Sequence, residues 1–403
     1  MGLIDIETAR AAVLERSPSP EAEPVPLRSA EGRRLAAAVV AQADVPGFDN
    51  SAMDGYAVRA ADTAGAAVSS PVVLRRIGES RAGSPSGAAV GPGEAVAIST
   101  GAMVPAGADA VVRVEDTSTT GEEVKVSSPV ARGASIRSRG EDIAAGREVL
   151  PAGALIGAAE LGALAATGVA TVPAARRPRV SVLLTGDELV EPGTELGPGQ
   201  IHDSNAYAVP PLATSAGAEI GCVEVIGDDR GTTAKAIERG LEGDVLVVCG
   251  GVSVGEHDHV RPALGSLGVE QVFWGVSLRP GKPTYFGVAP RGTLVFGLPG
   301  NPVSAMVTFL LFVRPALLAM QGAEPSARSL TARLARPYRK VEGRAEAIRV
   351  RVEPGDGGWV ITPTGPQGSH VLTSMIGADG LAFAPAEAVG LEEGTELRVE
   401  LIG

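Results

Sequence analysis

The segment "VFGLPGNPVSAMVTF", residues 295–309, places two glycines and two prolines between an apolar strand-like run and an apolar helix-like run. Asn301 is a favourable helix cap, and Pro302 suits the first position of a helix. A helix that begins in this way points free backbone N–H groups and the positive end of its dipole beyond the sheet edge. The segment therefore predicts a strand, a bend that can hold an anion, and a helix. An ordinary capped helix after a turn is the alternative explanation of this motif alone.

Strand-like and helix-like runs alternate on both sides of this segment, over residues 177–323. Runs typical of buried strands, such as "VSVLLTGDE" (180–188) and "DVLVVCGG" (244–251), alternate with helix-like runs such as "TTAKAIERGLEG" (232–243). This alternation predicts a mostly parallel sheet with helices on both faces. Ligands of such sheets bind beyond the carboxyl ends of the strands, where we therefore expect the functional site.

The rest of the chain has a different pattern. Short β-branched runs divided by Gly and Pro fill residues 45–140 and predict a β-rich domain. Strand-like runs return over residues 324–403, which predict a small C-terminal β domain. Residues 1–44 together with 141–176, each with one helix-like run, are predicted to form a linking domain. The predicted fold class is therefore multidomain, α/β plus β.

The composition excludes several classes of function. Lys and Arg number 35 and Asp and Glu 47, so the net charge is 35 − 47 = −12, and such a chain binds nucleic acid and anionic membranes poorly. The start "MGLIDIETAR" lacks a basic and apolar signal region. The longest apolar run, "VSAMVTFLLFV" (303–313), is too short to span a bilayer. The two cysteines, Cys222 and Cys249, have neither zinc spacing nor a disulfide framework. We expect a cytoplasmic protein with no nucleic-acid or membrane partner.

Three strand exits in the α/β segment are polar and glycine-rich: "TGDEL" (185–189), "GGVSVGEHDH" (250–259) and "GLPGNPVS" (297–304). Glycine permits close backbone approach and positive φ, so two such loops on one sheet edge favour an anion pocket. Carboxylates at the same edge would repel an anion unless a hard cation such as Mg²⁺ bridges the two. The acids at or near these exits are Asp187, Glu188, Asp203, Asp228, Asp229, Glu256 and Asp258, and we expect Asp229 and Glu256 to be solvated acids without a role in binding.

Cations come from the turn "SLRPGKPTYFG" (277–287), where Arg279 and Lys282 stand on either side of a Pro-Gly pair. A rigid turn of this kind suits an oxyanion clamp, although a solvated turn explains it equally well. In the β-rich part, Asp54 and Thr100 lie in polar segments that do not fit a simple strand pattern. Polar density without periodicity indicates function rather than packing.

Taken together, these segments resemble one family, the molybdopterin molybdenumtransferases of the bacterial MoeA type, which are related to the E domain of gephyrin. The resemblance covers nearly the whole chain. The motifs that carry it, in family order, are "FDNSAMDGYAV", "STGAMVPAGADAVV", "RGEDI", "LLTGDEL", "GQIHDSNAYAV", "GGVSVGEHD", "RPGKPTYFG" and "GLPGNPVSAMVTF".

The resemblance implies an elongated homodimer with an α/β molybdopterin-binding domain, a barrel-like C-terminal domain and two N-terminal domains, one of which links and dimerises. It implies an enzyme that takes adenylylated molybdopterin and molybdate. In a Mg²⁺-dependent step this enzyme inserts molybdenum and releases AMP. Upstream molybdopterin adenylyltransferase and downstream maturation proteins of molybdoenzymes are the partners that it suggests.

Residue by residue, the resemblance implies catalytic roles for Asp54, Thr100, Glu188, Asp228 and Asp258, with Mg²⁺ held by Glu188, Asp228 and Asp258. Asp54 and Thr100 would reach the cleft from the dimer partner. The resemblance also implies that Lys282, Arg344 and Ser369 contact the molybdate or the pterin. The other predicted substrate-binding residues come from the loop and turn patterns described above: Gly250, Gly251, Ser253, Gly255, Arg279, Gly297, Gly300, Asn301, Pro302 and Ser304.

The chain departs from the family pattern at two positions. Relatives often carry lysines where this chain has Gly275 and Arg279. Gly275 lacks the positive charge, whereas Arg279 keeps the charge on a planar guanidinium in place of a compact ammonium group. Two other functions remain as alternatives. One is a CinA-type nucleotide pyrophosphatase, which leaves the N-terminal motifs unexplained. The other is a non-catalytic dimeric scaffold, against which the acids of the predicted site argue.

Overall fold

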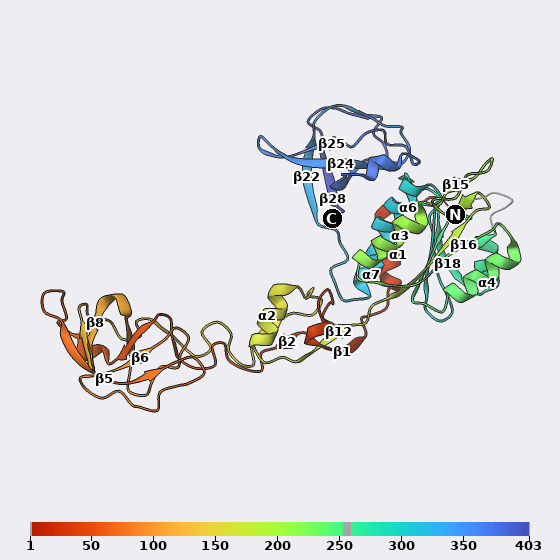
Figure 1. Ribbon diagram of the computed structural model, residues 1–403. Helices are drawn as coiled ribbons and strands as arrows, with labels where there is room; N and C mark the ends of the chain where they lie inside the picture. Colours follow the sequence, from red (N-terminus) through yellow and green to blue (C-terminus); the bar gives the residue numbers. More distant parts are fainter. Residues whose placement is uncertain (1, 253–258, 403) are drawn as a thin grey trace.

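The computed structural model describes residues 2–252 and 259–402 of the chain (Figure 1). A β-rich unit lies at one end of an elongated molecule, and an α/β unit with the C-terminal β unit lies at the other. A slender linking unit, built from two distant stretches of sequence, lies between them. The multidomain α/β plus β fold class is thereby confirmed.

The α/β unit is built on a six-stranded sheet of order β16-β13-β17-β21-β20-β18. Neighbours among the first four strands pair in parallel, whereas β20 is antiparallel to both of its neighbours, so the sheet is mostly parallel as predicted. In sheet order the strands are β16 (Glu219–Ile226), β13 (Arg179–Thr185), β17 (Val245–Cys249), β21 (Leu294–Leu298), β20 (Tyr285–Val288) and β18 (Glu270–Trp274).

Helices cover both faces of this sheet. Successive strand residues point to opposite faces, and apolar residues on both faces of β13 are buried. On β13, Val182 and Leu184 join one buried cluster and Leu183 joins the other. The first cluster is completed by α1 (Ile6–Arg16), α3 (Asn205–Ser215), α6 (Pro302–Thr308), the π-helical η4 (Phe309–Val313) and α7 (Arg314–Ala319). The second is completed by α4 (Arg230–Gly240) and α5 (Val260–Ser266).

Helix α1 packs on the α/β unit, although residues 1–44 were predicted to belong to the linking domain. Ile6, Ala9 and Val13 are buried in the core of the sheet, and Ile4 forms a bridge with Val276. The physical reason is that the apolar residues of α1 pack against η4 and α7 and are buried in the core of the α/β unit.

The segment Pro302–Ala319 is long and apolar enough to cross a membrane by length and composition, with a mean hydropathy of 1.8 over 18 residues. In the structure 72% of it is buried inside the protein. It is therefore the central core helix of the α/β unit, and its apolar character serves packing.

The N-terminal β-rich unit contains a six-stranded sheet of order β7-β4-β6-β5-β9-β8. Its strands are β4 (Gly55–Val58), β5 (Val72–Ser80), β6 (Glu94–Ile98), β7 (Ala110–Arg113), β8 (Thr117–Thr120) and β9 (Glu123–Val126), with short helices η2 (Ala60–Thr63) and η3 (Val114–Asp116). A two-stranded ribbon, β3 (Asn50–Ser51) with β10 (Ile136–Arg137), lies beside it. The linking unit comprises β1 (Ala22–Pro26), η1 (Leu27–Ser29), β2 (Val39–Val40), β11 (Glu148–Leu150), α2 (Ala158–Ala166) and β12 (Thr171–Ala175).

The C-terminal unit is a closed barrel, because β26 pairs with both β24 and β28. Its five strands are β22 (Ser329–Leu334), β24 (Ala345–Gly355), β25 (Gly358–Pro363), β26 (Gly380–Ala384) and β28 (Glu396–Leu401). The sequence pattern did not identify β26, whose small residues have low strand propensity. The remaining short elements are β14 (Leu189–Val190), β15 (Ile201–His202), β19 (Leu278–Arg279), β23 (Tyr338–Arg339), β27 (Gly390–Leu391) and η5 (Leu372–Met375).

Candidate active site

A cavity of about 460 Å³ lies at the carboxyl ends of the parallel strands β13, β17 and β21. This is the sheet edge at which ligands of open α/β sheets bind. Of the predicted site residues, the structure brings seven together around it: Glu188, Asp228, Gly250, Gly251, Gly300, Asn301 and Pro302. The lining also includes Thr185, Ile201, Asn205 and Cys249.

Close packing of backbone explains the glycines of this cavity. Gly250 and Gly251 have φ of 92° and 62°, and a Cβ on Gly250 would lie 2.7 Å from Thr185 Oγ1. The N–H of Gly250 donates to the carbonyl of Leu298 at 3.0 Å, so this amide joins two strand ends and is not free for a ligand. Among the described residues, the N–H groups of Gly251, Gly300 and Asn301 have no hydrogen-bond partner, and all three residues line the cavity.

Two residues predicted to bind substrate lie elsewhere. Gly297 is buried inside β21, where a Cβ would be 2.5 Å from Val252 Cγ1, so it serves close packing of the strand. Ser304 is 3% exposed within α6, and its carbonyl accepts a hydrogen bond from Thr308 Oγ1 at 2.7 Å. Neither residue is part of the cavity lining.

The acidic loops are arranged so that neighbouring acids have different tasks. Asp187 Oδ1 accepts a hydrogen bond from the N–H of Asp228 at 3.0 Å, which holds the two loops together. Asp229 caps α4 by accepting from the N–H of Thr232 at 2.8 Å, and this bond holds the pKa of Asp229 below its usual value. Asp228 lines the cavity and Asp229 does not. Asp229 is therefore the structural acid of the pair.

The remaining predicted residues of this loop edge, Ser253, Gly255 and Asp258, lie outside the described residues. Over residues 2–252 and 259–402, no group of three His, Cys, Asp or Glu side chains could hold a metal ion. Glu188 and Asp228 nevertheless share the cavity. Carboxylate oxygens are ligands that suit Mg²⁺.

Sequence reasoning missed Asn205, the first residue of α3, which lines the cavity and is 8% exposed. Its Nδ2 donates to the carbonyl of Gly300 at 2.8 Å and so anchors the bend before α6. The signal in the sequence was the polar run "HDSN" that precedes an apolar helix. From this run the sequence pattern indicated only Asp203, as one of the acids near the strand exits.

In the β-rich unit the structure joins the two predicted residues directly. Asp54 Oδ1 accepts hydrogen bonds from the N–H and the Oγ1 of Thr100, at 2.7 and 3.0 Å. These bonds hold the pKa of Asp54 below its usual value, the backbone bond contributing most. The pair lies in a different unit from the cavity, with the linking unit in between (Figure 1).

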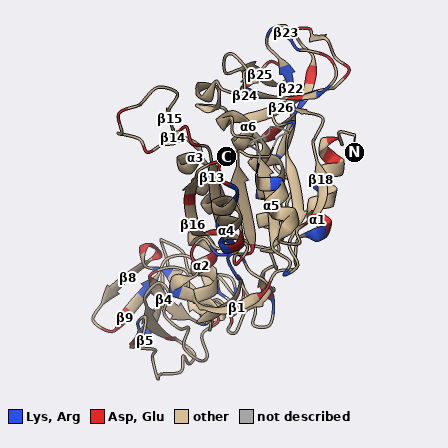
Figure 2. Cartoon of the chain, turned by 90° about the vertical axis from the view of Figure 1, so that its right-hand side faces the viewer, with Lys and Arg blue, Asp and Glu red and all other residues tan. Residues whose placement is uncertain are grey.

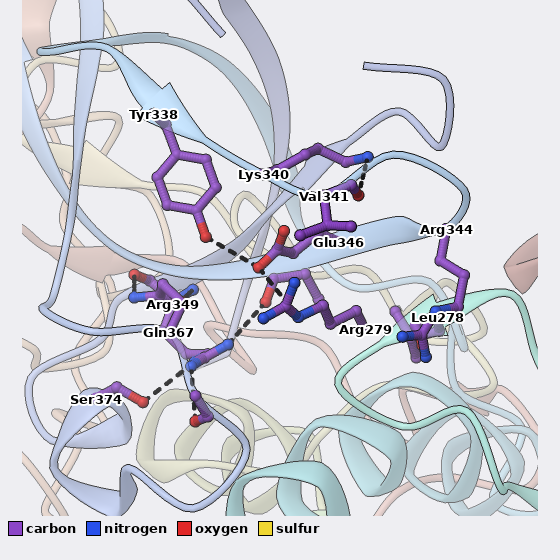
Figure 3. A network of polar contacts seen from close by, with 12 residues as sticks. Leu278, Arg279, Tyr338, Lys340, Val341, Arg344, Glu346, Arg349, Gln367 and Ser374 are labelled. Carbon is purple, nitrogen blue, oxygen red and sulfur yellow. Dashed lines mark hydrogen bonds and ion pairs between the residues drawn. The ribbon is translucent and has the colours of Figure 1, made fainter. Parts of the chain in front are cut away.

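The basic turn faces the barrel, and its residues do not line the cavity. Strand β19 pairs in parallel with β24, which places Arg279 opposite Glu346 with Nε 4.0 Å from Oε1. Arg344 Nη1 donates to the carbonyl of Leu278 at 3.4 Å, and Lys282 is exposed. Figure 3 shows Arg279 directed toward Glu346, with Arg344 at the edge of the same group. In Figure 2 the Lys, Arg, Asp and Glu segments are interleaved over all units.

A buried polar network lies beneath this turn (Figure 3). Glu346 is 2% exposed and its Oε1 accepts from Tyr338 Oη at 2.9 Å. Burial lowers the pKa of the fully enclosed Arg349 to about 10. Arg349 also donates to the carbonyl of Gly368 at 3.4 Å, and so holds the loop that carries the predicted Ser369. Arg279, Arg344 and Ser369 therefore border one network, separate from the cavity lining.

Comparisons with known proteins place the chain in a family. Three domain models match it: the MoeA N-terminal region (domains I and II) over residues 4–168, a probable molybdopterin binding domain over 181–319, and the MoeA C-terminal region (domain IV) over 331–402. These are the domains of an enzyme class in molybdenum cofactor biosynthesis.

The relatives are similar along their whole length. A molybdopterin molybdenumtransferase 2 of Mycobacterium tuberculosis is 39% identical over 93% of this chain and 94% of its own. The molybdopterin molybdenumtransferase of Bacillus subtilis is 35% identical over 99% and 94%. A crystal structure of a MoeA protein from Pyrococcus horikoshii matches all of both chains with a TM-score of 0.85 and 37% identity. The chain belongs to the MoeA family of molybdopterin molybdenumtransferases.

Proposed function

We propose that this protein acts on adenylylated molybdopterin in a Mg²⁺-dependent step, in which water cleaves the phosphoanhydride bond, AMP leaves, and molybdenum from molybdate is inserted into the dithiolene of the molybdopterin. The observation that carries the proposal is the cavity at the strand ends, where two carboxylates and several backbone N–H donors line one space of about 460 Å³. That volume lies in the range of sites for cofactor-sized molecules. The match of residues 181–319 to a probable molybdopterin binding domain supports the choice of guest.

Glu188 and Asp228 are the described residues that would hold Mg²⁺, with Asp258 as a third predicted ligand. When bound, the ion would neutralise negative charge on the adenylate phosphates and on the group that leaves. The backbone N–H groups of Gly251, Gly300 and Asn301 would bind the phosphate oxygens of the guest.

Molybdate is a doubly charged oxyanion, and Arg279, Lys282 and Arg344 are the cations proposed to receive it. Arg279 Nε lies 4.0 Å from Glu346 Oε1, beyond hydrogen-bond distance, so its donors remain available to a ligand. A planar guanidinium can present two parallel N–H donors to two oxygens of an oxyanion. This is the proposed task of Arg279 in place of the lysine of many relatives.

We further propose that the protein acts as a homodimer, in which Asp54 and Thr100 of one copy complete the cavity of the other. Within one chain the Asp54–Thr100 pair and the cavity belong to different units (Figure 1). A symmetric dimer of an elongated chain can bring two such units together twice.

The test is release of AMP from adenylylated molybdopterin with molybdate and Mg²⁺, measured by chromatography. Asp228→Asn should lower the rate by about a hundredfold, because it removes one metal-binding charge. The matched control is Asp229→Asn, since Asn also caps helices and this side chain does not line the cavity. Its rate should stay within about twofold. Equal rates for Asp228→Asn and the unmutated protein would contradict the assignment of Asp228 as a Mg²⁺ ligand.

A further inference from the structure

The cavity at the strand ends carries hydrogen-bond acceptors as well as donors. Asn205 is 8% exposed and lines the cavity. Its Nδ2 donates to the carbonyl of Gly300 at 2.8 Å, and this bond settles which end of the amide is nitrogen. The opposite atom, Oδ1, is buried and has no hydrogen-bond partner in the part of the chain that the structure describes. A buried carbonyl oxygen without a hydrogen bond is unfavourable. A ligand that donates a hydrogen bond to Oδ1 would remove this cost.

A second acceptor lies beside the first. Asp203 is 4% exposed, and its Oδ1 accepts from the N–H groups of Asn205 and Ala206 at 2.9 and 3.1 Å. Its Oδ2 is buried and, over residues 2–252 and 259–402, has no partner. Asp203 also neighbours Cys249, which lines the cavity and whose pKa is raised to about 12 by burial and, to a smaller extent, by the Asp203 charge. Asp203 does not line the cavity itself, but it is bonded directly to the lining residue Asn205.

The cavity thus offers both hydrogen-bond donors and a hydrogen-bond acceptor. The N–H groups of Gly251, Gly300 and Asn301 suit an anionic group such as a phosphate. The oxygens of Asn205 and Asp203 suit a neutral group that presents N–H donors. A guest that carries both an anionic group and N–H donors can pair with both kinds of group at once.

We propose that Asn205, supported by Asp203, binds the N–H and NH₂ groups of a 2-amino-4-oxopyrimidine ring, the donor edge of a pterin. This inference rests on the proposed function and deepens it, because it names the residues that orient the pterin end of the guest. Asn205 then has two tasks: its Nδ2 holds the bend at Gly300, and its Oδ1 touches the guest.

The experiment uses two small probes that differ at this edge. Pterin carries the 2-amino group, and lumazine carries an oxygen there. Titrations followed by the fluorescence of the probes should show the full-length protein binding pterin about tenfold more tightly than lumazine, the factor of one added hydrogen bond. Asn205→Ala should bring this ratio close to one. Because Asn205→Ala also removes the tether of the bend at Gly300, inorganic phosphate, titrated by calorimetry, should bind the variant more weakly, and the pterin to lumazine ratio is the readout that reports on Oδ1.

A matched control and a second variant separate binding from folding. Gln321 is 2% exposed and its Nε2 donates to the carbonyl of Ala216 at 2.8 Å, so Gln321→Ala also removes a buried amide that tethers a carbonyl, but away from the cavity. It should keep the pterin to lumazine ratio. Asp203→Asn keeps an oxygen that can accept from the N–H groups of Asn205 and Ala206, but it replaces the acceptor Oδ2 by an NH₂ donor. This variant should therefore lower the pterin to lumazine ratio.

Three results would overturn the inference. One is an unmutated protein that binds pterin and lumazine equally, which means that water satisfies both oxygens. Another is equal weakening of pterin and lumazine by Asn205→Ala, with their ratio unchanged, which means that Asn205 only holds the bend. The third is loss of the ratio in Gln321→Ala. The proposed function is tested separately. If the protein releases AMP but Asn205→Ala leaves the pterin to lumazine ratio unchanged, only this inference is rejected. If the ratio depends on Asn205 but no AMP is released, only the proposed reaction is rejected.

Discussion

At the scale of single residues, the structure shows which glycines are required by packing. A Cβ on Gly55 would lie 1.9 Å from the carbonyl oxygen of Val112, across the pairing of β4 with β7. Gly55 directly follows Asp54, so this close approach also fixes the backbone that presents the Asp54–Thr100 pair. The glycine in "MDGYA" is therefore a packing requirement beside a candidate catalytic residue.

Gly55→Ala should destabilise the β-rich unit by roughly 3 kcal/mol, because the backbone of β7 must move. Hydrogen exchange of peptides that cover β4 and β7 measures this effect locally. The matched control is Gly162→Ala inside α2, where a Cβ meets nothing within 4 Å. There the change should stabilise the helix by about 1 kcal/mol and slow exchange. Unchanged exchange of β4 in Gly55→Ala would show that the strand pair adjusts without cost.

The sequence predicted the residues whose role depends on their own strand exit, and it missed those whose role depends on a distant partner. Glu188 and Asp228 follow strands, and parallel strands bring such exits together. Asn205 gains its role from Gly300, 95 positions away. Glu346 and Arg349 gain theirs from a network closed by the barrel. No local pattern encodes these long-range contacts.

At the scale of elements, the central helix of the α/β unit is interrupted for an identifiable reason. Pro315 has no N–H, so the carbonyl of Leu311 lacks the donor four residues ahead. Arg10 of α1 supplies one instead, with Nε 3.1 Å from that oxygen, and its Nη1 donates to Glu400 of β28 at 2.7 Å. Arg10 thereby joins α1, the π-helical segment and the barrel. The periodicity of the sequence predicted the helix here but not this local change of winding.

Arg10→Ala should lower the unfolding free energy by roughly 3 kcal/mol, because it removes the main partner of Glu400, whose side chain is 5% exposed. The fluorescence of Trp274 and Trp359 in urea reports on the sheet and the barrel. Arg16→Ala in the same helix is the control, since Arg16 pairs with the exposed Glu15 and otherwise donates to the carbonyl of Ala12 in its own helix, and it should cost about 0.5 kcal/mol or less. Equal midpoints for both variants would show that Arg398 alone satisfies Glu400.

At the scale of the whole molecule, the elongated shape separates two groups of predicted site residues. The Asp54–Thr100 pair lies in the β-rich unit, and Glu188 with Asp228 lies at the other end of the chain (Figure 1). If these groups act on one guest, they must come from different copies. The proposed homodimer therefore makes a prediction that a site contained in one chain does not share.

Chains carrying Asp54→Ala and chains carrying Glu188→Gln should each form dimers with little AMP release. A mixed dimer, isolated with one tag on each kind of chain, has one site with both defects and one intact site. It should recover about half of the unmutated rate, as two independent sites require. A mixed dimer that carries both substitutions on the same chain is the control, because each of its sites then contains one defect. It should stay inactive, and the opposite result, activity only in this control, would place Asp54 and Glu188 in a site of a single chain.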